Sequence, residues 1–458
     1  MKSTAEQIPA ELLSCPRCGG PLSPGDPWCC DRCAAHFPLL DGIPCLVAEP
    51  EGMLGEWRTR LNALLLELES QAARNREAIT DAVTRPATRN RLKLFSSACS
   101  DHARRLKALL APLDVAGGHA AIETYRALDS SGLPAGQGLT SYYANLHRDW
   151  CWGEAENAAG FDIVNSALGA EAPGRTLVLG AGAGRLAYDL QQARRPEALI
   201  AADINPLMLL VAQRVSAGET IELYEFPVAP RDLDSYAVLR KLAAPAATDA
   251  GLYWLLADAS RAPFAPGAYD TVVTHWLVDI LDEDFAVLAR RINNWLRPGG
   301  RWINSGSLVF QRPDPLQCYS LEEVIAACDE AGFGSLDPRE DRQPYLQSPA
   351  SRHARSETIV TWCVRKETEA AVAAPRTGLP SWIEKVDLPV PLLPGFVSRV
   401  LSMRIYAYVA SLVDGQRSLA DIAQVLVQER LMTAEEAVPA VRGFLLRLHE
   451  ESAMQISQ

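Results

Sequence analysis

Apolar residues in the middle of the chain occur in short runs that end at glycine or at an acid. The run from Thr176 to Leu179 leads into Gly-Ala-Gly-Ala-Gly, a helical pattern follows, and the next apolar run ends at Asp203. This order predicts a strand–helix–strand unit for a nucleoside-bearing cofactor. The glycines let the backbone approach the ligand, and the acid can accept both ribose hydroxyls. The three glycines are Gly180, Gly182 and Gly184.

Further apolar runs predict more strands of the same sheet. One run ends at Asp258, placed to accept from an adenine amino group, and another spans Thr271 to His275 and is followed by Asp279. Ligands of open α/β sheets lie beyond the carboxyl ends of the strands, so Asp258, His275 and Asp279 should face one site. Asp279 contacts substrate or caps the following helix. Residues 296–310, LRPGGRWINSGSLVF, predict a helix end, a turn and a returning strand: a late hairpin beside the substrate.

Helical periodicity dominates the region before this sheet. Gly55 to Leu113 alternates apolar and charged residues with a break at Arg85-Pro86, which predicts two or three amphipathic helices. Residues 117–138 predict a short helix and a glycine-bearing turn. Arg148 lies in the segment YYANLHRDWCWGEAEN. It either holds the carboxylate of the cofactor's methionyl group or pairs with a nearby acid.

The glycine spacing bears on the choice of cofactor. A dinucleotide site favours G-x-G-x-x-G with a pyrophosphate at the helix N-terminus, whereas this chain has G-x-G-x-G. The spacing therefore favours S-adenosylmethionine, which has no phosphate. A tight turn in an unrelated α/β domain is the alternative.

Six of the eleven cysteines fall between Cys15 and Cys45. Two C-x-x-C pairs in Pro/Gly-rich turns predict a tetrahedral zinc ribbon, with Cys29 as an alternative ligand and Cys45 as a buried thiol. A site with four thiolates is closed to chemistry, so the zinc is expected to be structural, and docking of a partner or substrate is the alternative. The predicted metal ligands are Cys15, Cys18, Cys30 and Cys33.

Composition limits the partners. The 458 residues carry a net charge of −12, which disfavours a general grip on nucleic acid or an anionic membrane. No apolar run reaches the roughly 20 residues that span a bilayer, and the N-terminus lacks a signal-peptide pattern. We therefore expect a cytoplasmic protein that binds neither DNA nor membrane.

The C-terminal region reads as a separate module. A low-structure linker, ETEAAVAAPRTGLP, precedes a helical periodicity in which Asp414-Gly415 ends one helix and Ser418 caps the next. This pattern predicts a small winged helix. In their order, the glycine turn, the acids after the second and third strands and the PGG segment are similar to the seven-stranded S-adenosylmethionine-dependent methyltransferases. The predicted organisation is therefore α/β, with a Rossmann-like seven-stranded methyltransferase domain at its centre. Its parts are a zinc ribbon (1–50), a helical connector (51–137), the methyltransferase domain (138–367), a linker (368–380) and the winged-helix module (381–458).

Several motifs between Ser141 and Lys366 together resemble the carnosine N-methyltransferase family: RDW with GEAEN, VLGAGAGRLAYDL, VVTHWLVDIL, LRPGGRWINSGSL and a terminal VRK. The resemblance implies that Asp279 grips an imidazole-bearing substrate. His275, at the end of the preceding strand, is either a proton relay in that reaction or a packed strand-end histidine. The cofactor-binding residues that the resemblance implies, together with His275 at the strand end, are Asn145, Arg148, Gly180, Gly182, Gly184, Asp203 and Asp258.

Departures from that family lie in the acceptor region. Its Tyr-His pair is Phe310-Gln311 here, its proline is Ser307, and its tyrosine cluster is replaced by Arg355, Ser356 and Glu357. The predicted substrate-binding residues are therefore Asp279, Phe310, Gln311 and Arg355.

Both terminal modules carry resemblances of their own. Residues 15–47 resemble zinc ribbons attached to, or partnered with, methyltransferases, and the C-terminal module resembles the pyrroloquinoline-quinone chaperone, which binds leader peptides. The sequence predicts an S-adenosylmethionine-dependent N-methyltransferase acting on an imidazole or amine of a small molecule, dipeptide or ribosomal peptide. For the C-terminal module, a structural or dimerising role and the recognition of a leader peptide or protein partner are the alternatives. A non-catalytic cofactor sensor or scaffold, and an RNA methyltransferase that grips RNA with the ribbon, are the alternatives.

Overall fold

The computed structural model describes residues 8–113, 140–248, 251–281, 283–312, 315–370, 388–392 and 404–454. The chain divides into two compact units, residues 1–372 and 373–458. Each unit is described by itself.

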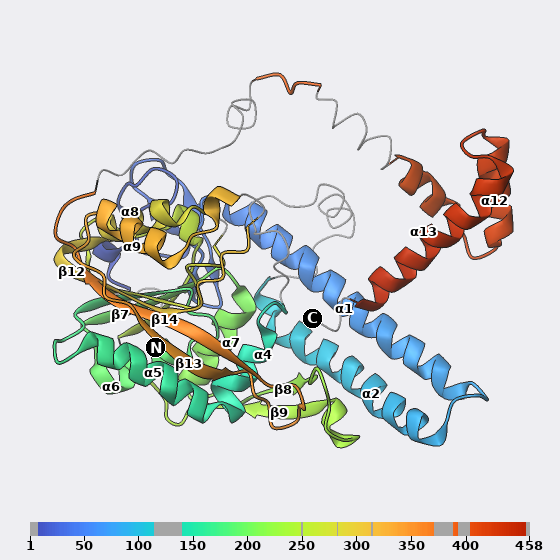
Figure 1. The fold of residues 1–458 in the computed structure, drawn as a ribbon, viewed down its shortest axis with the longest axis horizontal. Coiled ribbons are helices and arrows are strands. Elements are labelled where there is room, and N and C mark those ends of the chain that lie inside the picture. Colours follow the sequence, from blue (N-terminus) through green and yellow to red (C-terminus); the bar gives the residue numbers. More distant parts are fainter. Residues whose placement is uncertain are drawn as a thin grey trace. The chain divides into compact units, whose positions relative to one another are not determined.

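A seven-stranded sheet forms the centre of the first unit, in the order β10-β7-β6-β11-β12-β14-β13 (Figure 1). The pairs from β10 to β12 are parallel, and β14 is antiparallel to both of its neighbours. The order reverses between β6 and β11, and in such sheets a ligand crevice opens at the carboxyl ends of the strands on either side of the reversal. The strands are β6 (Arg175–Leu179), β7 (Ala198–Asp203), β10 (Leu252–Leu256), β11 (Tyr269–His275), β12 (Leu296–Gly306), β13 (Arg339–Tyr345) and β14 (Arg355–Arg365).

Helices cover both faces of this sheet. Helices α5 (Glu154–Leu168) and α6 (Arg185–Arg194) lie on one face, and α8 (Phe285–Trp295) and α9 (Leu321–Glu330) lie on the other (Figure 1). Helix α7 (Pro206–Ser216) follows β7. Strands β7 and β10 are almost continuously apolar because they lie within the covered part of the sheet, while β11 and β12 also bury polar residues such as Thr274 and Asn304. The predicted α/β fold with seven strands is confirmed.

The helix end, turn and returning strand predicted at 296–310 are present: α8 ends at Trp295, Gly299 has a φ of +74°, and β12 runs to Gly306. Strand β12 pairs in parallel with β11, so the chain enters it from helix α8, and the connection is not a hairpin of two neighbouring strands. The backbone N–H of Gly299 donates to Lys366 O at this end. The end of β12 that meets the crevice is its carboxyl end, at Gly306 and Ser307.

The helical connector forms as predicted. Helices α1 (Pro50–Thr80) and α2 (Pro86–Leu109) are followed by a short turn of helix, η3 (Ala111–Leu113). Proline at the first position of α2 explains the break, because proline suits a helix start and disrupts a helix interior. Helix α2 packs against a hairpin of β8 (Ile221–Glu225) and β9 (Val238–Leu242). The predicted helix and turn at 117–138 lie outside the described residues.

The N-terminal segment is a small β-structure packed onto the sheet domain. It begins with η2 (Ala10–Leu12), contains the antiparallel strands β1 (Leu22–Ser23), β2 (Trp28–Cys30) and β3 (His36–Phe37), and ends with the pair β4 (Leu39–Leu40) and β5 (Ile43–Pro44). Trp28 and Phe37 are fully buried in an apolar cluster that they share with the sheet.

The second unit is helical where it is described. A helix at 404–411 precedes α12 (Leu419–Gln428) and α13 (Ala434–Met454). Gly415 has a φ of +77° and Ser418 forms a capping box with Asp421, as the sequence indicates. No strand occurs within 404–454, so the winged helix stays a prediction. Among the described residues, no helix is long and apolar enough to span a bilayer.

Candidate functional site

A cavity of about 810 Å³ opens at the carboxyl ends of the central strands. Its walls come from every connection that leaves this edge of the sheet, as well as from the segment before α5. The sequence-predicted residues that line it are Asn145, Arg148, Gly180, Gly182, Asp203, Asp258, His275, Asp279, Gln311 and Arg355.

The glycine loop and Asp203 are joined by the backbone. The carboxylate of Asp203 accepts from the backbone N–H of Gly182 and of Asn205, both at 2.8 Å. Burial raises the pKa of Asp203, and these amide donors oppose that rise. Gly182 has a φ of +55° and open space where a side chain would begin. The loop therefore leaves its backbone exposed to a ligand beside a carboxylate of fixed orientation.

The other two glycines are required by packing. A Cβ on Gly180 would lie 2.6 Å from the Leu277 side chain, and one on Gly184 would lie 2.4 Å from Trp254. Gly184 is not part of the cavity wall. It lets α6 approach the sheet, which explains the glycine without a direct ligand contact.

The RDW segment is bound to the glycine loop. Trp150 Nε1 donates to Ala183 O at 2.8 Å, and Arg185 donates to the carbonyl of Asp149 at 2.9 Å. Arg148 pairs with Asp149 at 2.7 Å and also lines the cavity, so the ion-pair alternative is present, and the contact with a methionyl carboxylate stays a prediction. The roles of Trp150 and Arg185 were missed because nothing in the sequence indicates which backbone carbonyls they reach.

Asn145 carries an unsatisfied acceptor. Its Oδ1 atom is buried without a partner among the described residues, and its side chain lines the cavity. A buried polar atom without a partner is costly, so this atom is a natural contact for a ligand donor.

Asp258 and Asp284 act as helix caps. Asp258 accepts from the backbone N–H and the hydroxyl of Ser260 at 2.8 and 2.7 Å and starts a short helical turn, η6 (Ala259–Arg261). Asp284 accepts from two amides at the start of α8. The helix that follows β11 is thus capped by Asp284, and the cap alternative for Asp279 is wrong.

Asp279 is buried and only half satisfied. Its side chain is 4% exposed, and its Oδ2 accepts from Ser307 Oγ at 2.6 Å and from Val309 N at 2.9 Å. Its Oδ1 atom has no partner among the described residues, and the residue lines the cavity. The connection after β12 therefore fixes one oxygen of this carboxylate and leaves the other for a ligand.

His275 is a neutral imidazole. Burial lowers its pKa to about 3, and the guanidinium of Arg148 acts in the same direction. Its ring packs against α5, where a Cβ on Gly160 would lie 3.7 Å from Nε2. A group with this pKa is a weak proton acceptor at neutral pH.

An aromatic wall, Trp276 and Tyr345, faces this part of the cavity. The two rings lie 4.8 Å apart, and the Arg355 guanidinium lies 4.5 Å from the centre of the Tyr345 ring. Trp276 has a φ of +54° that is accommodated because Gly306 has no side chain: a Cβ there would lie 2.8 Å from Trp276 N. Neither wall residue was predicted from the sequence, although Trp276 lies within the VVTHWLVDIL motif.

Glu156 holds Tyr345 in place. Its carboxylate accepts from the backbone N–H of Leu346 and of Gln347, each at 2.9 Å. Phe310 lies elsewhere, against Phe285 and Tyr319 at ring distances of 6.0 and 5.6 Å, and is not part of the cavity wall.

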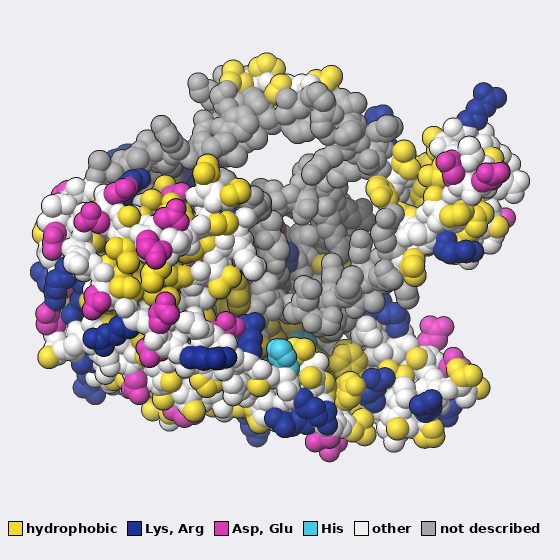
Figure 2. All heavy atoms as spheres, in the orientation of Figure 1, with side chains coloured by type: hydrophobic (Ala, Val, Ile, Leu, Met, Phe, Trp, Pro, Cys, Tyr) yellow, Lys and Arg dark blue, Asp and Glu magenta, His cyan; other side chains and the backbone are white. Residues whose placement is uncertain are grey.

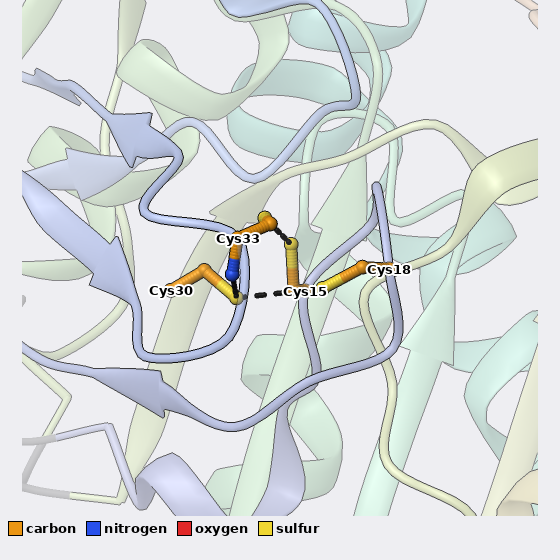
Figure 3. A group of neighbouring side chains, drawn as sticks. All are labelled: Cys15, Cys18, Cys30 and Cys33. Carbon is orange, nitrogen blue, oxygen red and sulfur yellow. Dashed lines mark hydrogen bonds between the residues drawn. The ribbon is translucent and has the colours of Figure 1, made fainter.

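The four predicted metal ligands converge (Figure 3). All of their sulfur atoms lie within 4.8 Å of one another, with Cys15 to Cys33 at 3.7 Å and Cys18 to Cys30 at 3.5 Å. Tetrahedral zinc–thiolate bonds of about 2.3 Å require sulfur atoms roughly 3.8 Å apart, so the cluster is compatible with zinc.

Neighbouring residues agree with this set of four ligands. A Cβ on Gly20 would lie 3.2 Å from Cys18 Sγ and 3.3 Å from Cys30 Sγ. Cys29 Sγ instead contacts His36 Nδ1 at 3.1 Å. Cys45 is fully buried, and burial raises its pKa to about 12, as expected for a packed thiol.

Residues 177–304 match a sequence family described as a methyltransferase domain. The matched segment runs from β6 to β12 and includes the glycine loop, Asp203, Asp258 and Asp279. The chain contains an S-adenosylmethionine-dependent methyltransferase domain. The part of the cavity formed by Asn145, Arg148, Gly182 and Asp203 could hold such a cofactor, because it offers an exposed loop backbone, an oriented carboxylate and an unsatisfied buried acceptor.

Solved structures similar to this methyltransferase include three N-methyltransferase or putative methyltransferase chains. Phosphoethanolamine N-methyltransferase 2 of Haemonchus contortus is 19% identical, with 44% of this chain and 43% of that chain covered and a TM-score of 0.31. NodS of Bradyrhizobium japonicum is 14% identical, with 46% and 97% covered and a TM-score of 0.31. A putative methyltransferase of Bacillus halodurans is 11% identical, with 46% and 100% covered and a TM-score of 0.33.

The chain spans less than half the length of the first of these proteins. No protein of curated function matches the sequence.

Proposed function

We propose that this methyltransferase transfers a methyl group to an imidazole-type or amine nitrogen of a small molecule, a dipeptide or a ribosomally made peptide. The observation that carries the proposal is Asp279, a buried carboxylate that lines the cavity and whose Oδ1 has no hydrogen-bond partner among the described residues. An acceptor N–H would satisfy that oxygen, and the negative charge would stabilise the positive charge that develops as the nitrogen is alkylated.

The residues have distinct tasks in this proposal. The bound cofactor supplies an activated methyl group with a neutral leaving group. Asp203 accepts the ribose hydroxyls, Asn145 and Arg148 hold the amino-acid end, and Asp258 accepts from the adenine. Asp279 accepts a hydrogen bond from an N–H group of the acceptor and so orients it. For an imidazole, this bond selects the tautomer in which the other ring nitrogen has the free lone pair that attacks the methyl group.

The aromatic wall supports a flat acceptor. Trp276 lines the same cavity as Asp279, and a methylated imidazolium or ammonium would be attracted to its ring face, whereas the Arg355 guanidinium already lies over the Tyr345 ring. The similarity to the carnosine N-methyltransferase type belongs to the same proposal. Ser307 departs from that family, and in this chain its hydroxyl donates to Asp279.

Peptide recognition by the C-terminal module extends the proposal. Apolar side chains are exposed there, among them Tyr406, Val413 and Leu431 at 48, 52 and 47%. Such residues suit an apolar stretch of a leader peptide. On the face of the molecule that Figure 2 shows, acidic and basic side chains of the first unit are interspersed, which favours a peptide over a polyanion. We further propose that the protein acts in the cytoplasm.

The test is methyl transfer measured by mass spectrometry, with histidine, histidine-containing dipeptides, histidine-containing peptides and aliphatic amines as acceptors. Transfer to a nitrogen of one acceptor class, lost in Asp279→Asn while S-adenosylhomocysteine binding is retained, is the expected result. Cofactor binding without transfer to any acceptor would instead favour a cofactor-sensing scaffold. Transfer to RNA alone would favour the RNA methyltransferase alternative.

A further inference from the structure

The N-terminal segment with the four cysteines, residues 8–50 and called the ribbon below, covers the free edge of the central sheet. Strand β10 is the first strand in the sheet order, so one side of its backbone has no partner within that sheet. Cys45 forms a parallel bridge to Leu256 there, and Leu46 N donates to Leu256 O at 2.9 Å. The ribbon thus extends the sheet beside the last residue of β10.

The ribbon has a second attachment at residues 263–269, a few residues after the end of β10. Ser14 N donates to Pro263 O at 2.9 Å, and its hydroxyl donates to Phe264 O at 3.1 Å. The carbonyl of Leu12 accepts from Ala265 N at 3.0 Å and from the hydroxyl of Tyr269 at 2.8 Å. Leu12 and Tyr269 are fully buried, so these bonds are shielded from water.

The loop between the two attachments belongs to the cavity. Ala257 to Ser260 line it, and this stretch includes Asp258, the acid predicted to contact adenine. The sheet side of the loop is held by Ala257 N, which donates to Asp203 O at 2.9 Å. The ribbon holds the outer side of the same loop at residue 256 and at residues 263–265.

The cysteine cluster lies between the two attachments in sequence. Ser14 immediately precedes Cys15, while Cys45 and Leu46 follow the second C-x-x-C pair. The apolar cluster that contains Cys15, Trp28 and Phe37 also contains Leu255, Ala257 and Phe264. A metal that joins the two cysteine pairs therefore also fixes the two backbone arms that hold the loop.

We propose that the metal-loaded ribbon is a positioning element of the cofactor site: the Leu12–Ser14 and Cys45–Leu46 arms fix the loop 257–265 and raise the affinity for S-adenosylmethionine and its demethylated product. Coupling between two binding sites is reciprocal, so the cofactor product must raise the affinity for the metal by the same factor. The inference depends on the methyltransferase domain and not on the identity of the acceptor.

The first experiment compares the full-length protein with and without zinc. Calorimetric titration with S-adenosylhomocysteine should give roughly 10-fold weaker binding after chelation, with faster hydrogen exchange of the amides of residues 257–265. Competition with a zinc chelator should show roughly 10-fold tighter zinc retention when S-adenosylhomocysteine is present. Unchanged affinity of a zinc-free protein with an intact circular dichroism spectrum would overturn the proposal.

Paired variants test the same idea with zinc in place, and they decide the matter if chelation unfolds the protein. Ser14→Ala removes the hydroxyl bond to Phe264 and should weaken S-adenosylhomocysteine binding about 3-fold. Ser23→Ala is the control, because Ser23 Oγ donates to exposed Asp31 within the ribbon. Both variants should retain zinc by elemental analysis. Equal cofactor affinity in the two variants would contradict the proposed positioning role of the ribbon.

Discussion

The two halves of the cavity are built differently. In the cofactor half, Gly182, Asp203 and Asn205 lie within a short stretch of chain, and backbone amides orient the carboxylate. In the acceptor half, Trp276, Asp279, Ser307, Tyr345 and Arg355 come from the connections after β11 and β12 and from the β13–β14 hairpin.

This difference determines how the binding of cofactor and of acceptor responds to substitutions in each half. Backbone amides are present whatever the side chains, so the loop fixes the orientation of the Asp203 carboxylate, while Asn145 and Arg148 reach this half from the segment before α5. The acceptor half consists of side chains on separate segments, and Asp279 is oriented there by Ser307 and Val309 from the next connection. Substitutions in one half should therefore leave binding in the other half nearly intact, which the following predictions test.

The largest effect is expected for Asp279→Asn. Loss of the negative charge beside the acceptor nitrogen should lower kcat/KM by about 100-fold or more, with unchanged affinity for S-adenosylhomocysteine. Steady-state kinetics and calorimetry measure the two quantities. Glu357→Gln, another cavity acid, should cost much less. A comparable loss in Glu357→Gln would mean that general cavity charge, rather than Asp279, matters.

Asp203→Ala should act on the other half. It removes the acceptor of two backbone N–H groups, and we expect roughly 30-fold weaker binding of S-adenosylhomocysteine with little change in the acceptor KM. Asp270→Ala is a matched control. Asp270 also accepts from a backbone N–H, that of Arg175 at 2.7 Å, but it lies at the amino ends of the strands, away from the cavity. It should lower thermal stability without changing cofactor affinity. An equal loss of affinity in both variants would refute the local role of Asp203.

Trp276→Leu should raise the acceptor KM about 10-fold, because it removes one ring of the aromatic wall. Phe310→Leu should leave methyl transfer unchanged, since Phe310 packs against Phe285 and Tyr319 away from the cavity. Kinetics of both variants at saturating cofactor measure the difference. A larger effect from Phe310 would restore it as a substrate residue.

The smallest effect on activity is expected for His275→Gln, within about 3-fold at pH 7.5, because an imidazole with a pKa near 3 is already neutral. Its folded pKa lies below the usual 6.5, so the unfolded chain binds a proton first and stability falls as the pH decreases from about 6.5 towards 3. The wild type should lose about 1.4 kcal/mol more unfolding free energy per pH unit than the variant between pH 6 and 4. Urea titrations check the slope, and equal slopes would contradict the low pKa.

Local patterns were sufficient for much of the fold. Apolar runs and glycines predicted β6, β7, β10 and β11, the periodicity with the Arg85-Pro86 break predicted two or three helices, and the C-x-x-C spacing predicted the four-cysteine cluster. Pro298 to Gly300 predicted the turn before β12, but not that β12 pairs in parallel with β11.

Long-range contacts account for what was missed at the site. Ser307 and Asp279, which share a hydrogen bond, are 28 positions apart in the sequence. Glu156 and Leu346, which share another, are 190 positions apart. Asp258, Asp279 and Asp284 look alike in sequence, yet two cap helices and one keeps a free oxygen.

The sequence by itself determined the chemistry that depends on neighbours along the chain: the glycine turn, the acid that closes the next strand, and thiol pairs that turn towards one ion. These features follow from backbone conformations set within a few residues. Only the tertiary structure decided which carboxylate oxygen stays unsatisfied, which rings meet as a wall, and where the ribbon holds the sheet. Those outcomes depend on distant segments meeting in a packed interior, where burial and the available partners fix the state of each polar atom.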